Sequence, residues 1–258
     1  MLNIQNTVVL NIVIALTSLL KCNNKSLVKK LNRLLQLPLL AIFMAPIANA
    51  DQYKFEYFES QLDYFKKLTL GQYANNNDKR VIKWVDDINI YVKGDMPSFL
   101  SSELDSIIAE LNQIIDAIKL TRVISEEHAN FIIFLESAED YLNIYPKVPL
   151  DYIEKGGVSS IYPNLDSEIF EGSMFMDIPR FRDDIVRRHV LRKLLTQSLG
   201  IPFESPRYVD SIFAEHPFAQ IVIEYSNFDK TIIKKLYDEC IKAGMDKFEL
   251  DHALLNRC

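Results

Sequence analysis

Glycine is scarce in this sequence, with only seven residues among 258. Such a low number excludes a glycine-rich phosphate-binding loop, a collagen-like repeat and a flexible Gly/Ser linker. The remaining composition is ordinary for a packed chain, because 48% of the residues are hydrophobic and 25% are charged. A chain of this length forms one or two domains and can bury a core without cross-links.

Cysteine is also scarce, since the chain contains only Cys22, Cys240 and Cys258. Three cysteines exclude a four-cysteine zinc site, and their spacing excludes a C-x-x-C redox motif. In an oxidising compartment Cys240 and Cys258 could form a disulfide that contributes about 3 kcal/mol on the chain-entropy model. The alternative is two unpaired thiols near the C-terminus.

Acidic residues are absent from the first fifty positions, where five basic residues occur. An apolar run, "LLQLPLLAIFMAPIANA", starts at Leu34 and ends in Ala-Asn-Ala. This order is typical of a secretory signal peptide, so residues 1–50 are expected to be cleaved after Ala50. Pro38 and Pro46 interrupt the run, and no stable membrane span is expected after signal removal. We therefore expect an exported protein, periplasmic or extracellular.

A second apolar stretch, Val8–Leu20, precedes the basic residues, although a signal peptide does not need it. One explanation is that translation begins near Leu27 or Val28, so that residues 1–27 belong to a mis-assigned start. The alternative is a protein anchored in the membrane through an uncleaved N-terminus, with its basic loop on the cytoplasmic side.

Removal of these fifty residues leaves 24 of the 29 basic residues against all 35 acidic ones, a net charge of about −11. Nucleic acid and anionic lipid headgroups bind basic surfaces, so neither is expected as a partner.

Helical spacing of apolar residues runs from Asp51 to Tyr73, and the polar stretch "YANNNDKR" follows. The pattern predicts an N-terminal helical extension and linker over residues 51–79. Residues 80–258 are then expected to form a single domain.

The predicted domain opens with a strand, a helix and a second strand. Ile88, Ile90 and Val92 alternate with polar neighbours, as in a half-buried strand. The apolar stripe Leu104–Ile118 indicates a long helix, and Ala129–Ser137 indicates a buried strand. This order predicts an α+β fold in which helices pack on a mixed β-sheet.

The second half of the domain is predicted to contain fewer strands. Residues 138–171 predict one short helix and irregular loops, Gly172–Ile178 a strand, and Val186–Leu199 a helix. A last helix is predicted over Asp229–Ala243, with Gly244 at its stop.

The helix Val186–Leu199 ends in "LRKLLTQSLG", which has the outline of the zinc-peptidase pattern H-E-x-x-H-x-L-G. In that pattern two histidines one turn apart bind zinc, and the glutamate activates water. Here the three positions hold Lys193, Leu194 and Gln197, which supply none of that chemistry. His189 lies one turn earlier, but the other histidines are at no ligand spacing to it. No metal and no cofactor is therefore predicted.

Other catalytic patterns are missing from the sequence, which contains no G-x-S-x-G nucleophile motif. Adjacent acidic pairs such as Asp86-Asp87 are typical of solvated loops. The basic run from Arg187 to Lys193 could bind a carboxylate or phosphate, or it could pair with local acids such as Asp183.

Three segments, "LRKLLTQSLGIP", "YVDSIF" and "YSNFDKTIIKKLYDECIKAGM", resemble the bacterial envelope proteins grouped as domain of unknown function 2927. The matching positions are Arg192, Leu195–Gly200, Asp210–Phe213, Tyr225, Phe228, Asp229, Leu236–Asp238, Gly244 and Met245. The resemblance implies secretion and a zincin-like architecture, with a degenerate metallopeptidase motif and no established activity. Lys193 and Leu194 replace an acidic pair of the family pattern, and Phe203-Glu204 replaces an asparagine-aspartate turn.

These features favour a protein that binds a peptide or another envelope component in a cleft between the predicted strand Gly172–Ile178 and the helix Val186–Leu199. The alternatives are an atypical hydrolase that uses carboxylates elsewhere, such as Asp210 or Glu215, and a purely structural envelope protein. The candidate cleft residues are His189, Arg192, Lys193, Thr196, Gln197, Asp210 and Ser211.

Overall fold

The computed structural model describes residues 60–71, 79–215 and 219–255, which belong to one compact unit. The predicted signal peptide and its cleavage site lie outside these residues, as does Cys258. Within the described ranges, none of the helices combines the length and the apolar character that a membrane span requires.

A six-stranded mixed sheet forms the centre of the described chain. Its strands are β1 (Lys83–Trp84), β2 (Ile88–Lys93), β3 (Leu120–Arg122), β4 (Phe131–Phe134), β5 (Gly157–Pro163) and β6 (Glu168–Met176). The path β1-β6-β4-β2-β3 is parallel throughout, whereas β5 pairs with β6 in the antiparallel direction. The mixed sheet predicted from the sequence is thus confirmed.

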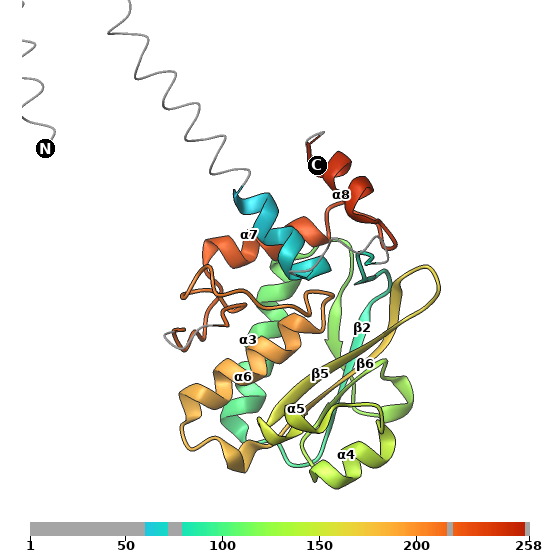
Figure 1. The fold of residues 1–258 in the computed structure, drawn as a ribbon. Coiled ribbons are helices and arrows are strands. Elements are labelled where there is room, and N and C mark those ends of the chain that lie inside the picture. The colour runs from blue at the N-terminus through green and yellow to red at the C-terminus, as the bar shows by residue number, and fades with distance from the viewer. Residues whose placement is uncertain (1–59, 72–78, 216–218, 256–258) are drawn as a thin grey trace, which may run out of the picture. The chain divides into compact units, whose positions relative to one another are not determined.

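Helices cover both faces of this sheet (Figure 1). They are α3 (Ser98–Ile114), α4 (Ala138–Ile144), α5 (Leu150–Glu154), α6 (Asp184–Gln197), α7 (Asn227–Leu236) and α8 (Lys247–Leu255), with the short 3-10 helices η1 (Glu126–His128) and η2 (Ile178–Arg180). The packing of α3 and α6 encloses the main core, and α4 lies over a smaller cluster on the opposite face.

Alternation along the strands sorts side chains between these two faces. Phe131 and Ile133 of β4 enter the main core with α3 and α6, whereas Phe134 packs with Tyr141 of α4. In β6, Met174 and Phe175 divide between the faces in the same way. Because both faces are covered, β4 is apolar throughout rather than alternating in polarity.

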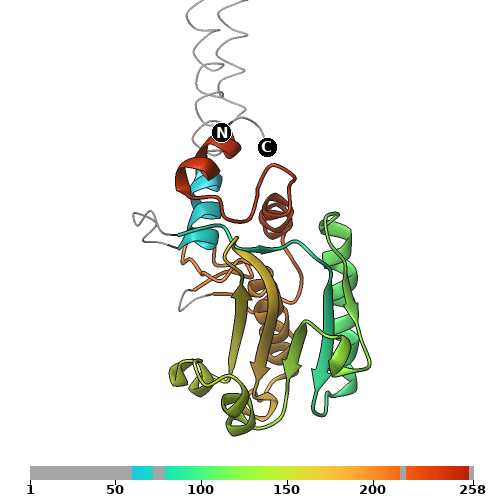
Figure 2. The same ribbon diagram turned by 90° about the vertical axis from the view of Figure 1, so that its right-hand side faces the viewer.

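Residues 60–70 form a helix that packs into the main core, near α7 and α8 at one end of the sheet (Figures 1 and 2). Tyr64, Phe65 and Leu68 are fully buried, and Lys66 pairs with Asp251 of α8 at 2.7 Å. The predicted boundary near residue 79 therefore does not separate two hydrophobic cores among the described residues.

Several predicted elements differ from the observed ones. The apolar stripe Leu104–Ile118 continues beyond the end of the helix that it predicts. Helix α3 ends at Ile114, and the next residue has an extended backbone. The region predicted to hold one short helix contains α4, α5 and β5. The predicted last helix, Asp229–Ala243, is α7, which ends at Leu236, and α8 after it was not predicted. A capping box formed by Ser226 and Asp229 starts α7.

Candidate binding cleft

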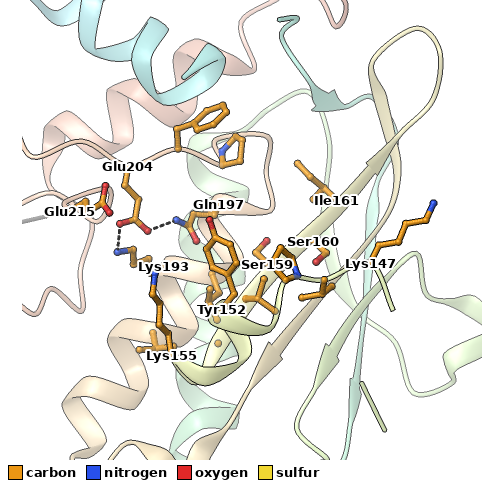
Figure 3. A pocket seen from close by; sticks show the side chains of 18 of the residues that line it. Lys147, Tyr152, Lys155, Ser159, Ser160, Ile161, Lys193, Gln197, Glu204 and Glu215 are labelled. Carbon is orange, nitrogen blue, oxygen red and sulfur yellow. Dashed lines mark hydrogen bonds and ion pairs between the residues drawn. The ribbon is translucent and has the colours of Figure 1, made fainter. Parts of the chain in front are cut away.

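A cavity of about 1070 Å³ lies between β5, α6 and the chain that follows α6 (Figure 3). Its walls come from Gly157–Tyr162 of β5, from α5, and from one side of α6. The prediction that Gly172–Ile178 forms the strand wall was wrong, because β5 pairs with that strand and lies between it and the cavity.

The outer edge of β5 faces the cavity with unpaired backbone groups. Asp177 N–H donates to the Gly156 carbonyl at 2.9 Å, and in an antiparallel pair every second residue points toward its partner strand. Gly157, Ser159 and Ile161 consequently direct their N–H and C=O groups away from β6. Among the described residues no other strand pairs with this edge.

Gly157 allows α6 to pass close beneath β5. A Cβ atom at this position would lie 2.9 Å from Leu194 Cδ1 and 3.6 Å from Val190 Cγ1. A larger residue would have to displace the Leu194 side chain from this contact. The glycine thus keeps the helix surface that carries His189, Lys193 and Gln197 beside the free strand edge.

Three polar side chains join α6 to the following loop at the cavity wall. Lys193 Nζ lies 3.0 Å from Glu204 Oε2, and Gln197 Nε2 donates to Glu204 Oε1 at 2.8 Å (Figure 3). Lys193 also donates to the Ala214 carbonyl at 3.3 Å. Both oxygens of Glu204 therefore have partners on α6.

This arrangement does not fit a zinc ion. An ammonium group has no lone pair for a metal, and Lys193 already places a positive charge against the Glu204 carboxylate. Leu194, at the position of the catalytic glutamate in the zinc-peptidase pattern, packs in the apolar core. Over the described ranges, no three His, Cys, Asp or Glu side chains gather in a group that could hold a metal.

His189 lines the same cavity one turn before Lys193. Its Nδ1 atom lies 2.8 Å from the Val222 carbonyl and 3.2 Å from the Val222 amide nitrogen. Burial lowers the pKa of His189, and the positive charge of Lys193 lowers it further. The ring is therefore neutral at pH 7 and adds no charge to the cavity.

Arg192 points away from the cavity and joins α6 to α3. Its guanidinium donates to Glu110 Oε2 at 2.6 Å and to Glu103 Oε1 at 3.0 Å, and it lies 4.6 Å from the centroid of the Tyr225 ring. With 3% of its surface exposed, Arg192 is a buried interhelical contact and not a ligand-binding group.

The protein-family comparison matches residues 59–256 to the model described as "Protein of unknown function (DUF2927)". This chain belongs to the DUF2927 family. No curated protein matches the sequence.

Much of the DUF2927 motif holds the fold together. In the Gln-Ser-Leu-Gly ending, the Ser198 carbonyl accepts from Trp84 Nε1 and the Leu199 carbonyl accepts from the Tyr237 hydroxyl, each at 2.8 Å. Gly200 has a φ of +102°, and a Cβ atom there would lie 2.1 Å from the Ile82 carbonyl oxygen. The burial of Leu199 in the main core and the close approach of Ile82 to Gly200 explain a Leu-Gly ending without any metal chemistry.

The later DUF2927 motifs meet around the buried carboxylate of Asp229. Ser211 Oγ and Ser226 Oγ donate to it at 2.6 and 2.8 Å, and the amides of Ser226 and Ile212 donate as well. Ser211 Oγ also accepts from the Tyr64 hydroxyl. Desolvation raises the pKa of Asp229, and the hydrogen bonds oppose that rise.

The seven residues predicted for the cleft of this DUF2927 protein thus lie in different places. His189, Lys193 and Gln197 line the cavity, whereas Arg192, Thr196 and Ser211 are buried elsewhere and Asp210 is exposed outside it. Thr196 lies 2.6 Å from the Tyr225 hydroxyl. Sequence reasoning missed Ser159 and Ile161 on β5, although the β-branched and aromatic residues of "GVSSIYP" could have indicated a strand.

Proposed function

We propose that this protein is an exported, non-enzymatic binding protein that holds an extended polypeptide segment in the cleft between β5 and α6. The segment adds a strand to the free edge of β5. The observation that carries this proposal is an unpaired strand edge lining a cavity of about 1070 Å³. A volume at the upper end of the range for ligand pockets suits a peptide better than a small metabolite.

Strand addition supplies affinity through the backbone and leaves selectivity to side chains. Gly157, Ser159 and Ile161 each offer one outward N–H and one outward C=O group. Each ladder hydrogen bond contributes about 1 kcal/mol net, so the ladder alone gives weak binding. Contacts of alternate ligand side chains with α5 and α6 must supply the rest.

Binding is proposed in place of peptide hydrolysis because of the chemistry on α6. Lys193, Leu194 and Gln197 stand where zinc peptidases have two metal ligands and a general base. Glu215 lines the cavity as well, but no histidine or second carboxylate forms a hydrogen bond with it among the described residues. A helix beneath a mixed sheet with an antiparallel edge strand supports the zincin-like architecture that the motif implies.

A proline substitution tests the strand edge directly. Ser159→Pro removes an N–H group that faces the cavity, without removing a β5–β6 ladder bond. We expect this variant to retain the wild-type circular dichroism spectrum and to lose about fivefold in affinity for peptides selected from a random ten-residue array. Ser159→Ala, which keeps the N–H group, is the matched control and should bind like the wild type.

Two results would count against strand addition. One is an array on which the wild type binds no peptide at millimolar concentration. The other is a Ser159→Pro variant that is folded and binds the selected peptides as tightly as Ser159→Ala does.

A further inference from the structure

Charge on the cavity walls is opposite in sign to the charge of the whole chain, which is −6. Four lysines line the cavity against two glutamates, namely Lys79, Lys147, Lys155, Lys193, Glu204 and Glu215. Lys193 and Glu204 neutralise each other in their ion pair. Three lysines then remain against Glu215 alone, and the neutral His189 ring does not change this excess.

The three remaining lysines have no carboxylate partner within the described ranges. Lys79 Nζ lies 4.8 Å from the centroid of the Phe203 ring, and Lys155 Nζ lies 5.2 Å from that of Tyr152. Lys147 is exposed at the rim. An aromatic face stabilises an ammonium group but leaves its charge available to an anionic ligand.

The fold spreads these charges over the length of a bound strand. Tyr152 belongs to α5 and Lys155 follows its last residue, next to the start of β5, whereas Lys79 and Phe203 border the cavity beyond the end of α6. A strand paired with β5 would project successive side chains toward opposite faces of the sheet. Side chains at alternate positions would therefore point toward Lys147 and Lys155, which flank α5 in the chain.

We infer that the segment held on β5 is acidic, with carboxylate side chains at alternate positions. This inference rests on the proposed strand addition and names the class of ligand that the same cleft selects. Each carboxylate that reaches a rim lysine forms an exposed ion pair of modest strength, so selectivity arises from several such pairs acting together.

Three probe peptides test the inference. Each has ten residues, is acetylated and amidated, carries a fluorophore, and alternates threonine with glutamate, glutamine or lysine. In anisotropy titrations of the purified protein at 50 mM salt, we expect the glutamate peptide to bind about tenfold more tightly than the glutamine peptide, and the lysine peptide to bind most weakly. The preference should shrink at 500 mM salt, since screening shortens the range of exposed charges.

Charge reversal on the protein completes the test. Lys79→Glu combined with Lys155→Glu should abolish the preference for the glutamate peptide and improve binding of the lysine peptide. The matched control is Lys119→Glu combined with Lys234→Glu, two exposed lysines outside the cavity whose ammonium groups have no carboxylate partner among the described residues. It changes the net charge without touching the cavity.

The outcomes separate this inference from the proposed function. Equal binding of the glutamate and glutamine peptides would overturn the acidic preference and leave strand addition standing. Equal losses from the double control and from the double cavity variant would also overturn it, because net charge would then explain the preference. Failure of all three peptides to bind would overturn both.

Discussion

Lys83 is a buried lysine whose charge is affected by its surroundings. Lys83 has 8% of its surface exposed, and its ammonium group donates to the carbonyls of Leu236 and Ile241 at 3.0 and 2.7 Å. Burial, together with the nearby positive charge of Lys242, lowers the pKa of Lys83 to about 8. The Lys83 side chain thus caps the end of α7, while its burial makes the charged form of the ammonium group less favourable.

The lowered pKa predicts a pH dependence of stability. Between about pH 8 and pH 10.5 the unfolded chain binds more protons at Lys83 than the folded chain does, so the free energy of unfolding that this residue contributes rises with pH. Relative to Lys83→Met, the wild type should gain on the order of 1–2 kcal/mol between pH 7 and pH 9.5. Urea titrations of both proteins measure the free energy of unfolding at each pH. If the value for the wild type does not rise relative to that for Lys83→Met, the lowered pKa of Lys83 is contradicted.

At the scale of elements, local pattern predicted some segments well and others poorly. The stripe of α3 and the apolar run of β4 are strong local signals, because each element packs along most of its length. The strand β5 has a weaker pattern, since it owes its conformation to pairing with β6. The wall of the cleft was therefore the part of the candidate site that the local sequence pattern indicated least clearly.

The proposal of a zincin-like architecture leads to a specific prediction for helix α6. Lys193 and Gln197 contact the two oxygens of one carboxylate, so imidazoles at these positions would meet Glu204. The double variant Lys193→His with Gln197→His should bind Zn²⁺ with micromolar affinity or better through these three donors. Titration against a zinc-chelating dye measures the affinity for Zn²⁺, and the wild type is expected to show no binding above background.

Two controls test the geometry of that zinc site. Addition of Glu204→Gln to the double variant should weaken zinc binding by at least about tenfold, because it removes the anionic ligand. The single variant Lys193→His should bind far more weakly than the double variant. A double variant that binds zinc no better than the wild type would show that α6 and Glu204 lack metal-site geometry.

The stability of the described unit depends on contacts that its first helix, residues 60–70, makes with later parts of the chain. Tyr64, Phe65, Leu68 and Leu70 each have at most 1% of their surface exposed. Burial of one such side chain contributes about 1.5–3 kcal/mol, so together they approach the stability of an ordinary domain. The Tyr64 hydroxyl also reaches Ser211, which links the first described helix to the Asp229 network.

Truncation tests this dependence. A chain that begins at Arg80 should be unfolded or aggregated, whereas a chain that begins at Asp51 should show a cooperative thermal transition. Circular dichroism and size-exclusion chromatography compare the two. A folded, monomeric chain beginning at Arg80 would support the predicted boundary at residue 79.

A disulfide between Cys240 and Cys258 was predicted near the C-terminus. Cys240 is disulfide-bonded, and its predicted partner, Cys258, lies outside the described residues. The Cys240–Cys258 pairing therefore stays a prediction, as do export and cleavage after Ala50.

The sequence by itself determined the family, the mixed α/β content and the absence of zinc-ligand chemistry on α6, since these follow from residue types and local periodicity. The tertiary structure decided which motif residues reach the cavity. Lys193 and Gln197 share a helix face with His189, whereas Arg192 and Thr196 turn toward α3 and Tyr225. That division depends on which face of α6 meets β5, and long-range packing sets it.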